Sequence, residues 1–140
     1  MKEFRALHRY APMTARKARL AADMIRGEDV NRAMEILQFS PKRSSAALLK
    51  VLRSAAANAG QDEDVNVNRL YVCDVRADDG PLKHGRVMWR PGPQGRAMPY
   101  RKRTSHLTVV VRERDESDDG AGKKRSRKQS KPAAAAQAAD

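Results

Sequence analysis

One stretch of the sequence, residues 80–112, most constrains what this chain can fold into. No Asp or Glu falls within it. Its basic residues are Lys83, Arg86, Arg90, Arg96, Arg101, Lys102, Arg103 and Arg112. A protein core cannot hold the stretch, because each buried cation would need a partner. In water alone the cations repel one another and oppose folding. The stretch therefore predicts an arm that penetrates folded nucleic acid and is ordered by that polyanion.

Segments with the pattern of β-strands flank this arm. Residues 67–76 alternate between two faces, and residues 104–112 are rich in β-branched side chains. The alternation places Leu70 and Val72 on one face and Tyr71, Cys73 and Val75 on the other. Antiparallel pairing of the two segments makes residues 78–103 the distal part of one long hairpin. About 13 residues a side at ~3.3 Å each reach roughly 40 Å, against a radius of gyration near ~12 Å for the body, so the arm is predicted to project.

Three helices are predicted before these strands, after an extended segment at residues 4–14. Thr14 is a plausible N-cap of the first helix, which Gly27 ends. Asp29 caps the second helix. Ser40 and Pro41 fit the N-cap and first position of the third, which is expected to form the spine of the core. The apolar positions at helical spacing are Ala15, Ala18, Leu20, Ala21 and Met24 in the first helix, Ala33, Ile36 and Leu37 in the second, and Ala47, Leu48, Val51, Leu52, Ala55 and Ala59 in the third. The expected class is α+β.

A basic cluster, Arg16, Lys17 and Arg19, lies in the first turns of the first predicted helix. The start of a helix is the positive end of its dipole, so cations there are unfavourable unless an external anion is present. A solvated charged face is the alternative interpretation. The other helical cations, Lys42, Arg43, Lys50 and Arg53, are interpreted as ordinary solubilising charge.

The composition limits the partner. The formal net charge is +12, the pI is near 10.4 and 4% of residues are aromatic, which favours nucleic acid or an anionic membrane. A membrane is the weaker choice, because no apolar run approaches the roughly 20 residues that span a bilayer. No secretory signal is recognisable in the first residues, so a cytoplasmic location is expected. Cys73 is the only cysteine, which excludes an intramolecular disulfide and a multi-cysteine zinc site.

No pattern of a catalytic, metal or cofactor site is recognisable. The histidines, His8, His84 and His106, lack metal-ligand spacing and neighbouring carboxylates. Thr104 and Ser105 precede His106, but no nucleophile elbow surrounds them. The glycine-rich part of the arm lacks the Gly-Lys-Ser/Thr ending of a phosphate-binding loop. Trp89 is expected either to pack across the hairpin or to stack on a base or line a surface met by another polymer.

The domain organisation is expected to be simple. Residues 1–114 form one RNA-binding domain that includes the hairpin arm, residues 76–106. Residues 115–140, which are acidic, then basic, then alanine-rich, are expected to be a disordered tail. The tail is either an auxiliary RNA-binding segment or inert.

A series of blocks resembles bacterial large-subunit ribosomal protein twenty-two in order and spacing. They are TARKARLAADMIRG (14–27), AMEILQFSPK (33–42), LLKVLRSAAANA (48–59), LYV (70–72), DGP (79–81), GRA (95–97) and RKRTSHLTVVV (101–111). The resemblance covers residues 4–113. It implies a body of three helices against a small antiparallel sheet, with one very long protruding β-hairpin. The tip, residues 88–97, is longer than the usual tip of that family, and residues after 114 have no counterpart.

The resemblance also implies a role and partners. The protein would be a structural constituent of the large ribosomal subunit that binds several domains of its rRNA, contacts neighbouring ribosomal proteins and aids assembly, with no cofactor. The tip would line the exit tunnel and meet the nascent peptide in passing. The rRNA-binding residues would be Arg16, Lys17, Arg19, Lys83, Arg86, Arg90, Arg96, Arg101, Lys102, Arg103 and His106. The tunnel tip would comprise Met88, Trp89, Arg90, Pro91, Gly92 and Pro93. Charge alone would also permit a free-standing nucleic-acid-binding protein or RNA chaperone, and an enzyme is the more distant rival.

Overall fold

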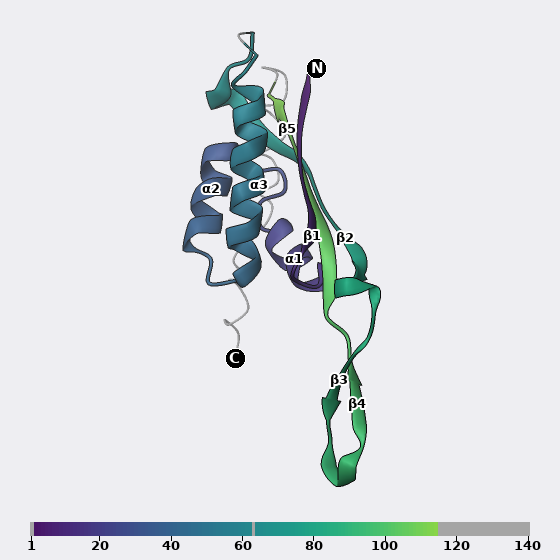
Figure 1. Ribbon diagram of the computed structural model, residues 1–140. Helices are drawn as coiled ribbons and strands as arrows, with labels where there is room; N and C mark the ends of the chain where they lie inside the picture. The colour runs from purple at the N-terminus through teal and green to yellow at the C-terminus, as the bar shows by residue number, and fades with distance from the viewer. Residues whose placement is uncertain (1, 63, 115–140) are drawn as a thin grey trace, which may run out of the picture.

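The structure, a computed structural model, describes residues 2–62 and 64–114. Its helices are α1 (Ala15–Ala22), α2 (Val30–Phe39) and α3 (Arg43–Ala59). Its strands are β1 (Glu3–Ala11), β2 (Leu70–Leu82), β3 (Met88–Pro91), β4 (Ala97–Tyr100) and β5 (Arg103–Glu113). All three helices lie on one side of the sheet β1-β5-β2, and the hairpin β3–β4 extends away from this body (Figure 1). The predicted α+β class is confirmed. The predicted tail lies outside the described residues.

The central strand of the sheet is β5, which pairs antiparallel with β1 on one side and β2 on the other. The segment that was expected only to be extended is therefore an edge strand. Its regular register with β5 ends between His8 and Ala11, where Tyr10 takes a φ of 58°. The strand stops just before Pro12, whose nitrogen carries no hydrogen for a ladder bond.

A β-bulge in β2 changes which side chains face the core. The ladder between β2 and β5 shifts between Val72 and Asp74, so Cys73 is the extra residue. Beyond the bulge, Val75 is fully buried on the helix side of the sheet. The prediction that Val75 shares a face with Tyr71 and Cys73 was wrong, because one inserted residue reverses the alternation of all that follow.

Helix α1 packs through alanine alone. Its buried residues are Ala15, Ala18, Ala21 and Ala22. Small side chains let the helix backbone approach the sheet and α3 closely. Leu20 and Met24, which were expected on the same stripe, are instead 56% and 38% exposed. The helix also ends before the predicted stop, and Gly27, at a φ of 81°, lies in the turns that lead to α2.

Helix α3 is the spine of the core, as predicted. Leu48, Leu52, Ala55 and Ala59 are fully buried, and Gly60 ends the helix. The predicted start was too early: Lys42, in an extended conformation, is the N-cap, and Ser40 and Pro41 precede the helix. Ser40 instead closes α2, since its N–H donates to the carbonyl of Ile36 at 3.1 Å.

The arm consists of two ladders separated by a break. The β2–β5 ladder continues to the pair Leu82 and Arg103, and the N–H of Lys83 then donates to the carbonyl of Lys102 at 2.8 Å. Residues 84–87 leave the ladder, after which β3 and β4 pair out to the tip. The long hairpin is confirmed, although it is interrupted and its distal half is a separate two-stranded sheet (Figure 1).

Candidate nucleic-acid interface

A groove of about 800 Å³ lies where the arm joins the body. Three segments far apart in sequence form it: the turn from β1 together with α1, the start of α3, and the base of the arm. Its lining residues are Pro12, Met13, Thr14, Lys17, Leu20, Lys42, Arg43, Ser44, Lys83, Lys102, Arg103 and Thr104. Half of them are Lys or Arg and none is acidic. We call this set of residues the junction groove.

Hydrogen bonds between α1 and the start of α3 fix one wall of the junction groove. The hydroxyl of Ser44 donates to the carbonyl of Lys17 at 3.3 Å, and Ser44 itself is buried. The ammonium group of Lys42 donates to the carbonyl of Leu20 at 3.2 Å. These bonds hold two basic segments close together although their positive charges repel each other. The packing of α1 against α3 therefore has to offset this repulsion.

The base of the arm forms the opposite wall. The hydroxyl of Thr104 donates to the carbonyl of Pro81 at 2.6 Å and ties the two strands of the arm together. Gly80 is required beside this bond, because a Cβ there would lie 2.6 Å from Thr104 Oγ1 and 3.2 Å from His106 Nε2. Just beyond this point the N–H of Lys83 donates to the carbonyl of Lys102, and both residues line the groove.

Two helix N-termini add to the positive potential of the junction groove. The N-cap residues of α1 and α3, Thr14 and Lys42, both line it. Neither helix has a side-chain cap or an acidic residue in its first turn. Unbonded N–H groups at a helix start carry partial positive charge and bind anions. The groove is therefore suited to phosphate oxygens.

In the part of the chain that the structure describes, the cations of the groove and of residues 83–103 have no acidic partners. Over residues 2–62 and 64–114, no ion pair joins an Asp or Glu to any of Arg16, Lys17, Lys42, Arg43, Lys83, Arg86, Arg90, Arg96, Arg101, Lys102 or Arg103. All of these residues are exposed. Their charge is available to an external anion.

The structure divides the predicted rRNA-binding residues into three groups. Lys17, Lys83, Lys102 and Arg103 meet in the junction groove. Arg86, Arg90, Arg96 and Arg101 lie exposed along the arm, and Arg16 is exposed on α1. The third group, Arg19 and His106, is engaged within the protein and is described next.

Arg19 and His106 hold parts of the protein together. The Nε of Arg19 donates to the carbonyl of Ala77 in β2 at 3.0 Å, and its guanidinium lies 3.8 Å from Asp79. His106 Nδ1 accepts the backbone N–H of Tyr10 at 3.2 Å, and the two rings meet edge to face at 4.9 Å. His106 thus supports the left-handed conformation at which β1 leaves its regular register. Binding of rRNA by these two residues stays a prediction.

Sequence reasoning missed two residues of the groove, Lys42 and Arg43. Both were interpreted as solubilising charge, yet both line the groove. The signal was present: they stand at the very start of a helix without an acid in its first turn, as Arg16 and Lys17 do in α1. Cations at the positive end of a helix dipole are unfavourable in α3 for the same reason as in α1.

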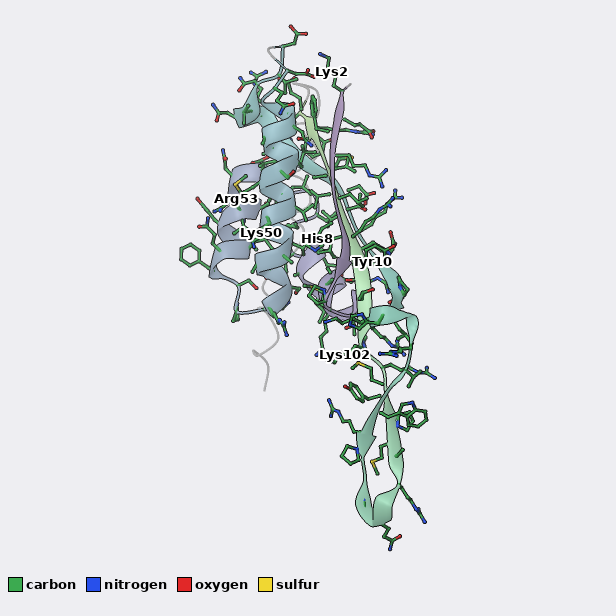
Figure 2. All side chains as sticks on the ribbon, in the orientation of Figure 1. Lys2, His8, Tyr10, Lys50, Arg53 and Lys102 are labelled. Atoms are coloured by element: carbon green, nitrogen blue, oxygen red, sulfur yellow. The ribbon has the colours of Figure 1, made fainter. Side chains whose placement is uncertain are left out.

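The side chains of the tip are largely exposed. Trp89 is 63% exposed and pairs across the hairpin with Pro99, so cross-strand packing does not bury it. The guanidinium of Arg90 lies over the ring of Tyr100, 4.2 Å from the ring centre. Figure 2 shows the side chains of the distal hairpin pointing outward on both sides. Contact of the tip with another polymer stays a prediction.

No group of three or more His, Cys, Asp or Glu among the described residues could hold a metal ion. In the same part of the chain, no helix is long and apolar enough to cross a membrane. Cys73 is a free, half-buried thiol in the β2 bulge.

The fold and the groove define a strongly basic α+β protein in which a groove and a protruding arm carry cations that have no acidic partner among the described residues. Residues 6–112 match the family described as ribosomal protein L22p/L17e. Three relatives are each called large ribosomal subunit protein uL22. That of Clostridium novyi (strain NT) is 44% identical over 113 residues, covering 80% of this chain and 98% of the relative. That of Thermoanaerobacter sp. (strain X514) is 47% identical over 113 residues, covering 81% and 99%. That of Carboxydothermus hydrogenoformans is 46% identical over 115 residues, covering 81% and 98%.

The chain therefore belongs to the ribosomal protein L22p/L17e family, as its sequence blocks predicted. This is a family of structural ribosomal proteins and not of enzymes.

Proposed function

We propose that this chain, a structural constituent of the large ribosomal subunit, binds large-subunit rRNA through the junction groove and the arm. Residues 1–114 act as one RNA-binding domain. The arm extends between several rRNA domains and aids assembly, and its tip, Met88 to Pro93, lines the exit tunnel for the nascent peptide. The protein works bound to ribosomes in the cytoplasm, with other large-subunit proteins as neighbours.

The junction groove is the observation that supports this proposal best. A groove lined half by Lys and Arg and by no acid is unfavourable for an isolated protein, since its cations repel one another. Phosphate groups supply the missing negative charge and release condensed counterions when they are neutralised. A groove built from the body on one wall and the arm on the other also favours a folded RNA segment over an isolated anion.

The Arg and Lys residues of the groove and the arm can bind rRNA without reading its base sequence. Arg and Lys contact phosphates, and contacts of this type determine position and not sequence. RNA of irregular shape is recognised through such contacts and through complementarity. Arg predominates on the arm, where a planar guanidinium can hold two phosphate oxygens or stack on a base. Gly95 at the tip turn takes a φ of 69°, which lets the backbone turn tightly beside RNA.

A double variant, Lys102→Ala with Arg103→Ala, tests the groove. If each cation neutralises one phosphate, its loss lowers the slope of log K against log salt by about 0.7–0.9, so the pair lowers it by roughly 1.5. Lys50→Ala with Arg53→Ala is the matched control, because these residues lie on the helical side of the body while Lys102 lies at the base of the arm (Figure 2). Filter binding to large-subunit rRNA over a salt series measures both. Equal slopes for the two double variants would refute the assignment of the groove.

A further inference from the structure

The distal hairpin has two chemically different faces. Side chains alternate along a strand, and directly paired residues of antiparallel strands point to the same face. One face, here called the cationic face, carries the pairs Met88 with Tyr100 and Arg90 with Met98. The other, called the uncharged face, carries the pairs Trp89 with Pro99 and Pro91 with Ala97. No other residues belong to the ladder of this small sheet.

The cationic face is organised around one aromatic ring. The guanidinium of Arg90 lies 4.2 Å from the centre of the Tyr100 ring, and the ammonium of Lys102 lies 5.9 Å from it. Both cations are thereby held on the same side of the arm. Near the tip, Gly92 leaves room for Met98, because a Cβ at Gly92 would lie 3.0 Å from the Cγ of Met98. The fold thus directs charge and methionine to one face.

The uncharged face has neither a cation nor an acid in its ladder pairs. All four of its side chains are exposed, and Trp89 is 63% exposed. Its two prolines, Pro91 and Pro99, each remove a backbone N–H from the hairpin, which leaves fewer donors for an added strand. Strand addition is the common way in which an extended peptide binds a sheet. The hairpin therefore resists being extended by a passing chain.

We infer that the cationic face lies against rRNA and that the uncharged face is the one exposed to the nascent polypeptide. Phosphates brought against the uncharged face would lose hydration without meeting a cation, which is unfavourable. A polypeptide moving past its four ladder side chains meets no fixed charge among them and few backbone donors, so these residues do not retain it. The inference rests on the proposed function, in which the tip lines the tunnel, and adds which residues face the lumen.

Adjacent residues on opposite faces allow a sharp test. The photocrosslinker p-benzoylphenylalanine is placed at Ala97 or at Met98, which are neighbours in β4 and both exposed, Met98 by 51%. Ribosomes that carry the full-length variant are stalled with a labelled nascent chain and irradiated. From Ala97, crosslinks to the nascent chain are expected to exceed those to rRNA several-fold, and from Met98 the ratio is expected to be reversed.

The outcomes separate the inference from the proposed function. Crosslinks from Ala97 mainly to rRNA would overturn the assignment of faces. In that case, crosslinks from Met98 to the nascent chain would still support tunnel lining. An absence of nascent-chain crosslinks from both positions, in ribosomes shown to contain the variants, would overturn tunnel lining itself and the inference with it. If both positions react equally with the nascent chain, tunnel lining stands and the division into faces is overturned.

A second variant distinguishes the uncharged face from a base-stacking surface. Stacking of one base on an aromatic side chain contributes about 1–3 kcal/mol, or roughly a 5- to 150-fold change in affinity. Trp89→Ala is expected to leave the affinity of the full chain for large-subunit rRNA unchanged within about twofold. A loss of tenfold or more would show that RNA covers this face, and the inference would fail.

Discussion

The cations in two regions of the molecule have different surroundings. One region is the outer face of the sheet with the start of β1, and the other is the junction groove with the distal arm. On the outer face of the sheet, the face without helices, Arg112 pairs with Glu3 and Arg76 pairs with Asp74. Near the start of β1, the ammonium of Lys2 lies 3.3 Å from Asp64 and 3.6 Å from Asp62. By contrast, none of the cations of the junction groove or of residues 83–103 has an acidic partner within the described residues. Figure 2 places Lys2 and Lys102 far apart along the length of the molecule.

This difference shows which charge is satisfied internally and which is directed to a partner. Exposed ion pairs contribute little to stability, typically below about 1 kcal/mol. The acids near Lys2 and on the outer face therefore serve mainly to lower the local positive potential. In the groove that potential is left uncompensated, and two helix N-termini increase it. The same composition thus yields one end that is close to neutral and one that requires a polyanion.

Gly80→Ala is expected to have the largest effect on the arm without changing any charge. Its new Cβ would lie 2.6 Å from Thr104 Oγ1 and would disturb the hydrogen bond to the carbonyl of Pro81. Overpacking of this kind costs about 1–3 kcal/mol. Urea unfolding should show the loss, and rRNA affinity should fall because the groove wall shifts.

Gly60→Ala is the control, since the nearest neighbour of its new Cβ would be 3.6 Å away. Equal stability of the two variants would mean that the strands are not tightly joined there.

Leu20→Glu removes the contrast between the two ends by supplying the groove with an acid. Leu20 lines the groove and is 56% exposed, so a carboxylate there should change the free energy of unfolding by no more than about 0.5 kcal/mol. Repulsion of a phosphate by about 1 kcal/mol would lower rRNA affinity roughly fivefold. Leu7→Glu, at a 43% exposed position on the outer face, is the matched control. The interpretation fails if the control lowers affinity as much as Leu20→Glu does.

The sequence predicted the elements better than their contacts. Helical periodicity identified α3, and the run of β-branched residues identified β5, because each pattern is a direct consequence of one buried face. Val75 was assigned to the wrong face, since a bulge at Cys73 has no signature in the alternation that it interrupts. The start of α3 was set at Pro41 by a local rule, whereas Lys42 takes the N-cap position in the fold.

Only the part of the candidate site that a local sequence pattern reveals could be predicted. An acid-free run of cations is visible in the sequence, so the arm and its base were found. The groove depends on tertiary structure, because the hydroxyl of Ser44 and the carbonyl of Lys17 meet only when α3 packs on α1. The bond from Tyr10 to His106 joins residues from opposite ends of the described chain, so no spacing rule could have assigned His106 a role within the fold.

Lys2→Met is expected to have the smallest effect, and it tests the neutral end. The hydrogen bond to Asp64 and then the charge of Asp62 raise the pKa of Lys2 above its ordinary value of 10.5. A raised pKa stabilises the fold fully below the ordinary value, and this contribution is lost only as the pH rises through the folded-state pKa. Melting temperatures of the variant and the parent should therefore run parallel around neutral pH and converge only in alkali.

The slope of log K for rRNA binding against log salt should not change in Lys2→Met, because this cation is already paired with acids. A salt slope lowered as much as expected for Lys102→Ala with Arg103→Ala would show that cations paired with acids also contact phosphates. The difference between paired and unpaired cations would then have no functional meaning.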